Sequence, residues 1–292
     1  MKILLIYNPV SGKSMNREAR LGKVLMELGK NNDEITVYQM KSKGDGALFI
    51  SKQQINDYSL IVVCGGDGTL HEIVDGALKA GYTGDIGYVP SGSTNDYATN
   101  LGINATNALE NIIAHKVMKL DVGEFNGEHF NYVAAFGFFT DIPYSTPQNV
   151  KNSLGYLAYI LEGAKELTDM KSIHLKCETD SAIFEDDFLV GMVSNTLSVG
   201  GRRLKEGNAK LDDGVMEYVF IKYPRNLLDI QNTIFALVNN KYDHRYMHFG
   251  QSKTFKIESD PTKWDLDGED GGLNDKVIIN THEKALNIIV GD

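Results

Sequence analysis

The chain has 292 residues, of which 42% are hydrophobic and 23% are charged, and its net charge is −10. This composition is typical of an ordinary globular protein, and the length predicts two domains. The negative charge argues against broad nucleic-acid binding and against general adhesion to anionic membranes. No apolar run approaches the roughly 20 residues of a transmembrane helix, and two cysteines without metal-ligand spacing fit a cytoplasmic protein.

The first part of the chain alternates predicted strands with predicted helices. This alternation is typical of a doubly wound, Rossmann-like parallel sheet, in which ligands bind outside the carboxyl ends of the strands. Polar turns follow three of the strands, so we expect these turns at one edge of the sheet. The strands are expected at 2–7, 34–40, 59–63 and 85–89, the helices at 21–28, 44–55 and 70–78, and the turns at 8–14, 65–69 and 90–98.

The turn Gly65-Gly66-Asp67-Gly68-Thr69 carries the strongest chemical signal. Its glycines let a ligand approach the backbone, and the N-terminus of the next helix, which Thr69 is placed to cap, favours a phosphate. Asp67 would repel that phosphate unless a cation lay between them, so it suggests Mg²⁺. A plain strand-to-helix turn with a polar tip is the alternative. The pattern is not the dinucleotide fingerprint, because His71 takes the third glycine position, and no Walker A loop is present.

The two other turns supply hydroxyl and amide groups that suit a phosphate or a ribose. Ser-Thr-Asn-Asp before an apolar stretch also serves as a helix cap, so the third turn has a structural interpretation beside the functional one. The residues concerned are Asn8, Pro9, Ser11 and Gly12 in the first turn, and Ser93, Thr94, Asn95 and Asp96 in the third.

Short predicted strands dominate after residue 125, which indicates an antiparallel β-sandwich. We therefore expect one domain at 1–125 and a second at 126–285. The strands are expected at 116–124, 129–135, 173–176, 187–193, 215–221, 254–259 and 276–280, with helices near 153–167 and 226–238.

Two acidic turns of the second half are candidate sites. The segment Asp212-Asp213-Gly214-Val215 can hold a hard cation with a side chain and a carbonyl, or it can be an Asp-Gly turn that enters a strand. The segment Asp267-Gly268-Glu269 is typical of an acidic hairpin turn. Basic residues at 202–205 and 241–245 form either solvated faces or contacts for anionic ligands and lipid headgroups.

Together the motifs resemble the diacylglycerol kinase catalytic domain family, most closely its soluble bacterial lipid kinases. The likeness rests on Asn8-Pro9 with Ser11-Gly12, on the Gly-Gly-Asp-Gly-Thr loop, and on the loop from Pro90 to Asp96, in that order. It implies a nucleotide-binding domain and a β-sandwich lipid-substrate domain, with the active site in the cleft between them. A last strand near 286–290 would return to the first domain. The implied reaction is ATP-dependent transfer of the γ-phosphoryl group to a hydroxyl of diacylglycerol or a related lipid.

The resemblance also implies roles for the candidate residues. Asp67, Asp96 and Asp212 would share a network of carboxylates and water around catalytic Mg²⁺, and Glu269 would take the proton of the lipid hydroxyl. A structural Mg²⁺ would be bound by Asp213 and the Val215 carbonyl beside Asp212, although Lys210 stands where some members have a further carboxylate. The nucleotide would be bound by Asn8, Pro9, Ser11, Gly12, Gly65, Gly66, Asp67, Gly68, Thr69, Ser93, Thr94 and Asn95.

A further departure and two alternatives accompany this interpretation. His71 stands where the family usually has Asn, and we expect it at the surface or in contact with phosphate. NAD kinases share the Gly-Gly-Asp-Gly-Thr loop, so an NAD-kinase-like phosphotransferase that acts on a soluble nucleotide is an alternative, as is a non-catalytic nucleotide-binding regulator. The expected partner is a lipid substrate met transiently at the membrane surface by a cytoplasmic protein, and a homodimer is compatible with the sequence.

Overall fold

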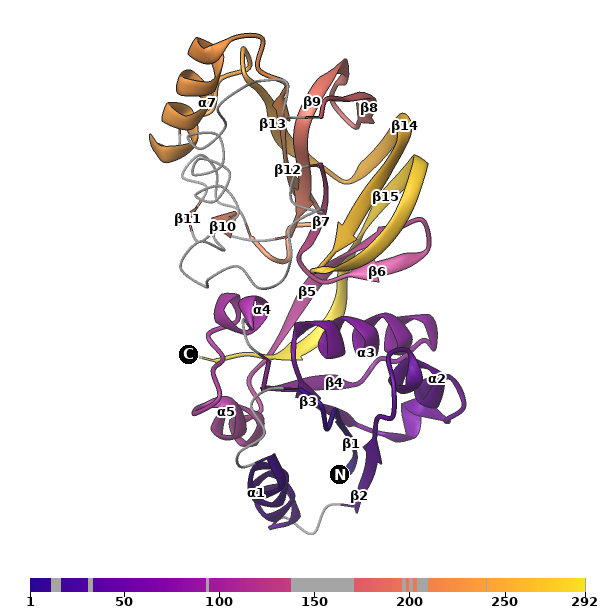
Figure 1. Ribbon diagram of the computed structural model, residues 1–292. Helices are drawn as coiled ribbons and strands as arrows, with labels where there is room; N and C mark the ends of the chain where they lie inside the picture. The colour runs from indigo at the N-terminus through magenta and orange to yellow at the C-terminus, as the bar shows by residue number, and fades with distance from the viewer. Residues whose placement is uncertain are drawn as a thin grey trace. The chain divides into compact units, whose positions relative to one another are not determined.

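The computed structural model describes residues 1–11, 17–30, 34–92, 95–137, 171–195, 198–199, 202–203, 210–239 and 241–291 (Figure 1). The chain divides into two compact units: unit 1 holds Met1–Val122 and Lys284–Asp292, and unit 2 holds Gly123–Glu283. In the described ranges, no helix is both long enough and apolar enough to cross a bilayer. The helix predicted near 153–167 lies outside the described residues.

Unit 1 is built on parallel strands in the order β2-β1-β3-β4. β1 (Lys2–Tyr7) pairs with β2 (Glu34–Gln39) on one side and with β3 (Leu60–Gly65) on the other, and β4 (Asp85–Pro90) pairs with β3. Every residue of β3 is buried, because its apolar sequence suits a strand covered on both faces. The end of β15 (Glu269–Ile289) lies parallel to β4, with Ile288 opposite Ile86.

Helices cover both faces of these strands (Figure 1). α1 (Arg17–Gly29) contacts α5 (Ala108–Ala114) on one face, and α2 (Asp45–Ser51) contacts α3 (Asp67–Lys79) on the other. The helix predicted over 44–55 is divided into α2 and a short 3-10 helix, η1 (Ile55–Asp57), because Gln54 takes a non-helical ψ of 75°. α4 (Asp96–Asn100) is a short helix that follows the third polar turn.

A carboxylate on α3 fixes the start of α2. Glu72 accepts hydrogen bonds from the backbone N–H groups of Gly44 at 2.9 Å, Gly46 at 2.7 Å and Ala47 at 3.2 Å. A negative charge at a helix N-terminus is favoured by the helix dipole and satisfies N–H groups that have no partner inside the helix. The hydrogen bonds of Glu72 thus connect α2 to α3, the helix that begins in the second polar turn.

Unit 2 is built from antiparallel strands, and β5 (Val117–Phe125) and β15 contribute residues to both units. β9 pairs with β7, β8 and β12, and β14 pairs with β15 in a long hairpin. The remaining strands are β6 (Glu128–Phe130), β7 (Val133–Gly137), β8 (Ile173–Thr179), β9 (Ile183–Ser194), β10 (Ser198–Val199), β11 (Arg202–Arg203), β12 (Met216–Lys222), β13 (Met247–Ser252) and β14 (Thr254–Leu266).

Aromatic side chains fill the core of unit 2. Trp264 is fully buried, and the rings of Phe125 and Phe136 lie 5.0 and 4.9 Å from it between centroids. Phe136 also meets Phe220 edge-on at 5.3 Å, an arrangement that aromatic quadrupoles favour. A second cluster forms where α7 (Leu227–Asn239) packs on β9 and β12. Its members include Ile230, Ala236 and Leu237 from the helix and Val190, Met192, Val219 and Ile221 from the strands.

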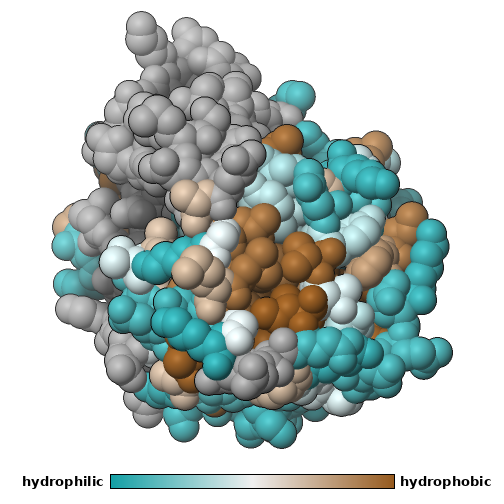
Figure 2. Space-filling model, turned by 90° about the horizontal axis from the view of Figure 1, so that it is seen from below, coloured by the Kyte–Doolittle hydropathy of each residue, from teal (hydrophilic) through white to brown (hydrophobic). Residues whose placement is uncertain are grey.

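Hydrophobic side chains also reach the surface. Figure 2 shows a continuous hydrophobic area bordered by hydrophilic residues on the face seen from below. In unit 1, a pocket of about 170 Å³ is lined mainly by Met1, Leu28, Leu60, Ile112 and Ile113. These side chains come from several elements, so no single stretch of the sequence predicts the pocket.

Candidate active site

Three turns of unit 1, which follow β1, β3 and β4, contact one another. Asn8 donates from Nδ2 to Thr69 Oγ1 at 2.8 Å. Ser91 donates its backbone N–H to Gly65 O at 2.7 Å and its hydroxyl to Ser11 Oγ at 3.2 Å. Of the predicted residues, Asn8, Pro9 and Ser11 lie in the first turn and Asn95 lies in the third. The predicted second turn is shorter than expected: Gly65 is the last residue of β3, Gly66 follows it, and α3 already begins with Asp67, Gly68 and Thr69. Gly12, Ser93 and Thr94 lie outside the described residues, so their roles stay predictions.

Gly66 and Gly92 lie against each other where the second and third turns meet. A Cβ on Gly92 would lie 2.8 Å from the Gly66 Cα and 2.9 Å from Asn95 Oδ1. A Cβ on Gly66 would lie 3.2 Å from the Gly92 Cα and 3.4 Å from Ser11 Oγ. Glycine is therefore required here by the close approach of two backbones, and a bare backbone is what a phosphate ligand can approach.

The N-terminus of α3 belongs to the second turn. The helix begins at Asp67, and Gly66 is its N-cap. The prediction that Thr69 caps the helix is therefore wrong: Thr69 lies within the first turn, where its hydroxyl accepts the hydrogen bond from Asn8. The first N–H groups of a helix have no partner inside it and coincide with the positive end of its dipole, so this end suits an anion.

Asp67, at the start of α3, is half-buried and contacts a tyrosine of β4. The hydroxyl of Tyr88, whose residue is 1% exposed, donates to Asp67 Oδ1 at 3.4 Å. Burial, and after it the Asp67 carboxylate, raises the pKa of Tyr88, so the phenol stays protonated and remains a donor. Sequence reasoning missed Tyr88, because an apolar strand gives no sign that one of its tyrosines reaches a site.

Asn95 shapes the third turn. Its Oδ1 accepts the backbone N–H of Gly92 at 2.9 Å, and its Nδ2 donates to Gly92 O at 3.0 Å. The φ of Asn95 is 54°, in the left-handed region that asparagine tolerates better than most residues. Asp96 follows as the first residue of α4, but its side chain is not described, so its catalytic role stays a prediction.

His71 was expected at the surface or in contact with phosphate. Its residue is only 5% exposed, within α3, so the surface position is wrong, and contact with phosphate stays a prediction. The reason is helical spacing, since His71 is three residues before Val74 and next to Leu70, both of which are buried.

In unit 2, Glu269 is the first residue of β15 and stands opposite Leu266 in the β14–β15 hairpin. The turn before it is Asp267-Gly268, whose φ angles of 54° and 89° are both positive. Positive φ at both central residues is what the type I′ hairpin turn requires, and Asp-Gly is a preferred sequence for it. The turn presents Glu269 half-buried at the tip of the hairpin.

Asp267 anchors this turn to another part of unit 2. Its Oδ2 accepts the backbone N–H of Asn131 at 2.6 Å, and its Oδ1 accepts those of Tyr132 at 2.9 Å and Val133 at 3.0 Å. The residue is 5% exposed, so these hydrogen bonds satisfy a buried carboxylate. Sequence reasoning took Asp267 only as a turn residue and missed this positioning role.

The Asp212–Val215 segment forms the turn that leads into β12. Gly214 has a φ of 80°, and Val215 donates its backbone N–H to Asp213 Oδ1 at 3.4 Å. A Cβ on Gly214 would lie 3.2 Å from Glu283 Oε2. Within the described part of the chain, neither Asp212 nor Asp213 belongs to a cluster of three side chains able to bind a metal, so the structural Mg²⁺ stays a prediction.

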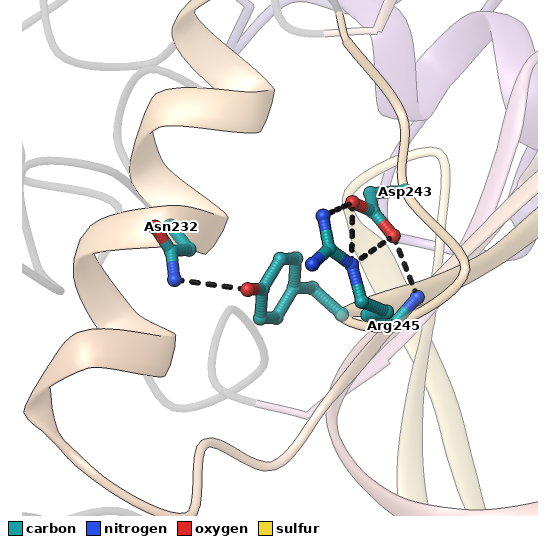
Figure 3. A network of polar contacts seen from close by, with 4 residues as sticks. Asn232, Asp243 and Arg245 are labelled. Carbon is teal, nitrogen blue, oxygen red and sulfur yellow. Dashed lines mark hydrogen bonds and ion pairs between the residues drawn. The ribbon is translucent and has the colours of Figure 1, made fainter.

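The basic segment 241–245 is partly neutralised by its own acid. The guanidinium of Arg245 contacts both carboxylate oxygens of Asp243, at 2.6 to 3.1 Å (Figure 3). Hydrogen bonding to Arg245 lowers the pKa of Asp243 to about 2. Beside this pair, Asn232 of α7 donates to the hydroxyl of Tyr246 at 2.9 Å (Figure 3). Arg202 and Arg203 form β11, but their side chains are not described.

Comparison with known proteins agrees with the motifs. The model of the diacylglycerol kinase catalytic domain matches residues 2–125. The chain is similar to a diacylglycerol kinase of Bacillus subtilis, at 28% identity over 95% of this chain and 93% of the relative. It is similar to one of Staphylococcus haemolyticus, at 30% identity over 92% and 82%. A crystal structure of a diacylglycerol kinase from Bacillus anthracis shares the fold, with a TM-score of 0.74, 23% identity and coverage of 99% and 97%.

Proposed function

Because this chain belongs to the diacylglycerol kinase family, and is thus a kinase with an alcohol acceptor, we propose that it transfers the γ-phosphoryl group of ATP to a lipid hydroxyl. The acceptor is diacylglycerol or a related lipid. The observation that carries the proposal is the set of contacts among the three turns of unit 1, above all the approach of Gly66 to Gly92.

These turns fit a nucleotide's phosphates. Gly65, Gly66 and Gly68 leave the backbone accessible, and the N-terminus of α3 favours negative charge. Asn8 and Asn95 fix the turns on either side through their side-chain hydrogen bonds. Pro9, Ser11, Gly12, Thr69, Ser93 and Thr94 complete the proposed nucleotide-binding set.

The carboxylate of Asp67 would hold Mg²⁺ beside the phosphates, with its orientation set by the hydroxyl of Tyr88. Bound ATP supplies the phosphoryl group, and Mg²⁺ screens the charge on it. Asp96 and Asp212 are proposed to share the surrounding network of carboxylates and water. Asp213 and the carbonyl of Val215 are proposed as ligands of a structural Mg²⁺.

Glu269 is proposed as the base. The acceptor hydroxyl must lose its proton as its oxygen attacks phosphorus, and a positioned carboxylate can take that proton. Support comes from the position of Glu269 directly after a turn that Asp267 anchors through three backbone N–H groups. A base must be held in place to act, and these hydrogen bonds hold the turn that precedes Glu269.

Unit 1 is proposed to act as the Rossmann-like nucleotide-binding domain and unit 2 as the β-sandwich lipid-substrate domain. The proposed phosphate-binding turns lie in unit 1, and the proposed base, Glu269, lies in unit 2. The protein is proposed to meet its lipid at the membrane surface by peripheral contact.

A transfer assay tests the substrate class. The purified chain is incubated with γ-labelled ATP, Mg²⁺ and either diacylglycerol in phospholipid vesicles or NAD. We expect label in the organic phase with the lipid and none in NADP. Label in NADP without labelled lipid would reject a lipid kinase and favour a phosphotransferase that acts on a soluble nucleotide.

A matched pair of variants tests the base. Glu269→Gln removes the proton acceptor and should lower kcat by about 100-fold or more, with little change in the KM for ATP. Asp270→Asn removes the same charge from the neighbouring exposed residue and should retain activity. Equal activity of the two variants would exclude Glu269 as the base.

A further inference from the structure

Three side chains of metal-binding type, none of which the proposed reaction uses, gather on one face of unit 2. Glu124 of β5 stands directly opposite His129 of β6. His282 of β15 places Nε2 2.8 Å from Glu124 Oε2. The rings of His129 and His282 lie 5.6 Å apart between centroids, and one ligand atom from each of the three residues lies within 4.8 Å of the others.

The alternation of side chains along the strands explains why these residues meet. Phe125, Phe130 and Thr281, each next in sequence to one of the three, are 3%, 0% and 5% exposed. Successive side chains of a strand point to opposite faces, so the two histidines and the glutamate share the face turned away from the aromatic core. The side chains of His282 and Glu124 remain 42% and 27% exposed, so ions in solution can reach them.

We propose that Glu124, His129 and His282 form a binding site for Zn²⁺. Two imidazole nitrogens and one carboxylate oxygen are a donor set that zinc favours, whereas Mg²⁺ prefers oxygen ligands alone. Tetrahedral zinc with ligands at about 2.0 Å places the ligand atoms about 3.3 Å apart. The present separations of 2.8 Å and at most 4.8 Å span that value. Water takes the fourth position.

Another histidine with acidic neighbours shows what distinguishes this cluster. His174 of β8 directs Nδ1 to Asp187 at 3.0 Å and Nε2 to Glu185 at 3.2 Å. Its two ring nitrogens thus contact different carboxylates, so one ion cannot bind both acids and the histidine. The carboxylates, Asp187 first, raise the pKa of His174, which favours protonation of the ring and so opposes metal binding. His174 therefore serves as a matched control.

Bound zinc would connect the β5–β6 hairpin to β15. The free energy of binding then adds to the stability of the folded state, because the unfolded chain does not present the three ligands together. This site is independent of the proposed function, since it uses neither the turns of unit 1 nor Glu269.

Direct binding measurements test the site without reference to activity. The tag-free protein is stripped of metal with a chelator, dialysed and titrated with Zn²⁺ in competition with a chromogenic zinc indicator. We expect one tight equivalent and a rise in Tm of about 3 °C or more with Zn²⁺ but not with Mg²⁺. Co²⁺ in place of Zn²⁺ should give the visible absorption of a four-coordinate site. Absence of a tight equivalent would overturn the proposal.

Single substitutions test which side chains bind the zinc ion. His282→Gln and His129→Gln should each weaken Zn²⁺ binding by at least about tenfold, since even the loss of an outer hydrogen-bond partner has that effect. His174→Gln should bind zinc as the unaltered protein does. Circular dichroism checks that each variant is folded. If only one of the two cluster variants folds, its zinc affinity alone is enough to test the site. Unchanged affinity in the folded cluster variants, or an equal loss in His174→Gln, would place the zinc elsewhere and refute the site.

Discussion

The candidate residues of unit 1 and unit 2 are positioned in different ways. In unit 1, polar turns follow neighbouring parallel strands, and short side chains connect them: Asn8 reaches Thr69, 61 residues away. In unit 2, Glu269 lies on a hairpin whose turn is anchored by Asp267 to the backbone of Asn131, 136 residues away. The comparison teaches that a parallel sheet brings its motifs together through its topology, whereas an antiparallel hairpin needs one specific distant anchor.

The largest effect should come from removing that anchor. Asp267→Ala deprives three backbone N–H groups of their acceptor and puts alanine at a φ of 54°. Unsatisfied buried donors and a left-handed alanine should together lower the free energy of unfolding by about 3 kcal/mol, measured by urea denaturation. Asp275→Ala, at an exposed position of the same hairpin, should change it by less than about 0.5 kcal/mol. Similar stabilities of both variants would mean that the carboxylate does not anchor the turn.

An intermediate effect is expected where the turns of unit 1 meet. Gly92→Ala adds a Cβ 2.8 Å from the Gly66 Cα, so the two turns must separate. Overpacking of this kind costs about 1–3 kcal/mol, and we expect the affinity for ATP to fall by about 10- to 100-fold in a fluorescent-nucleotide titration. Gly22→Ala, in α1 with open space around its Cβ, is the matched control and should bind ATP normally. Unaltered affinity in Gly92→Ala would show that nucleotide binding does not depend on this contact.

The sequence predicts the turns of unit 1 well because their chemistry is local. Glycines and short polar residues directly after buried strands are visible in one stretch, and parallel strands bring their carboxyl ends to one edge. Tyr88 was missed because its hydroxyl contacts Asp67, on another element. The surface position considered for His71 was wrong because helical spacing puts this residue beside buried Leu70 and Val74.

The sequence predicts less of unit 2 because its strands depend on distant partners. Separate strands were predicted at 254–259, 276–280 and 286–290, yet β14 and β15 run much further, with register shifts between Glu258 and Thr262 and between Lys263 and Asp265. Such register shifts depend on how the strands pair with each other, so the periodicity of one stretch of the sequence does not show them. The Glu124–His282 contact joins residues 158 positions apart, so histidine spacing along the sequence could not show the cluster.

The smallest effect should come from a substitution in the exposed basic segment of unit 2. It tests whether a charged side-chain contact matters for stability only at buried positions such as Asp267. Arg245 lowers the pKa of Asp243 from its ordinary 3.8 to about 2. The stabilising ion pair is therefore complete above about pH 4 and is lost as the pH falls toward 2. Arg245→Ala should return the pKa of Asp243 toward 3.8 in a carboxyl-carbon NMR titration. Because both side chains lie at the surface, the equilibrium constant of unfolding at pH 7 and the rate of lipid phosphorylation should each change by less than about twofold.

An internal control comes from Asp180, whose pKa is lowered by the hydroxyl of Thr254 and the backbone N–H of Lys253 and not by a cation. That pKa should be the same with and without Arg245, since a hydrogen bond within unit 2 does not depend on a distant guanidinium. A large loss of lipid phosphorylation in Arg245→Ala would contradict the expected difference between the buried anchor at Asp267 and the exposed pair at Arg245. The guanidinium would then contact an anionic headgroup in preference to Asp243, and unit 2 would have a second functional region outside the anchored hairpin.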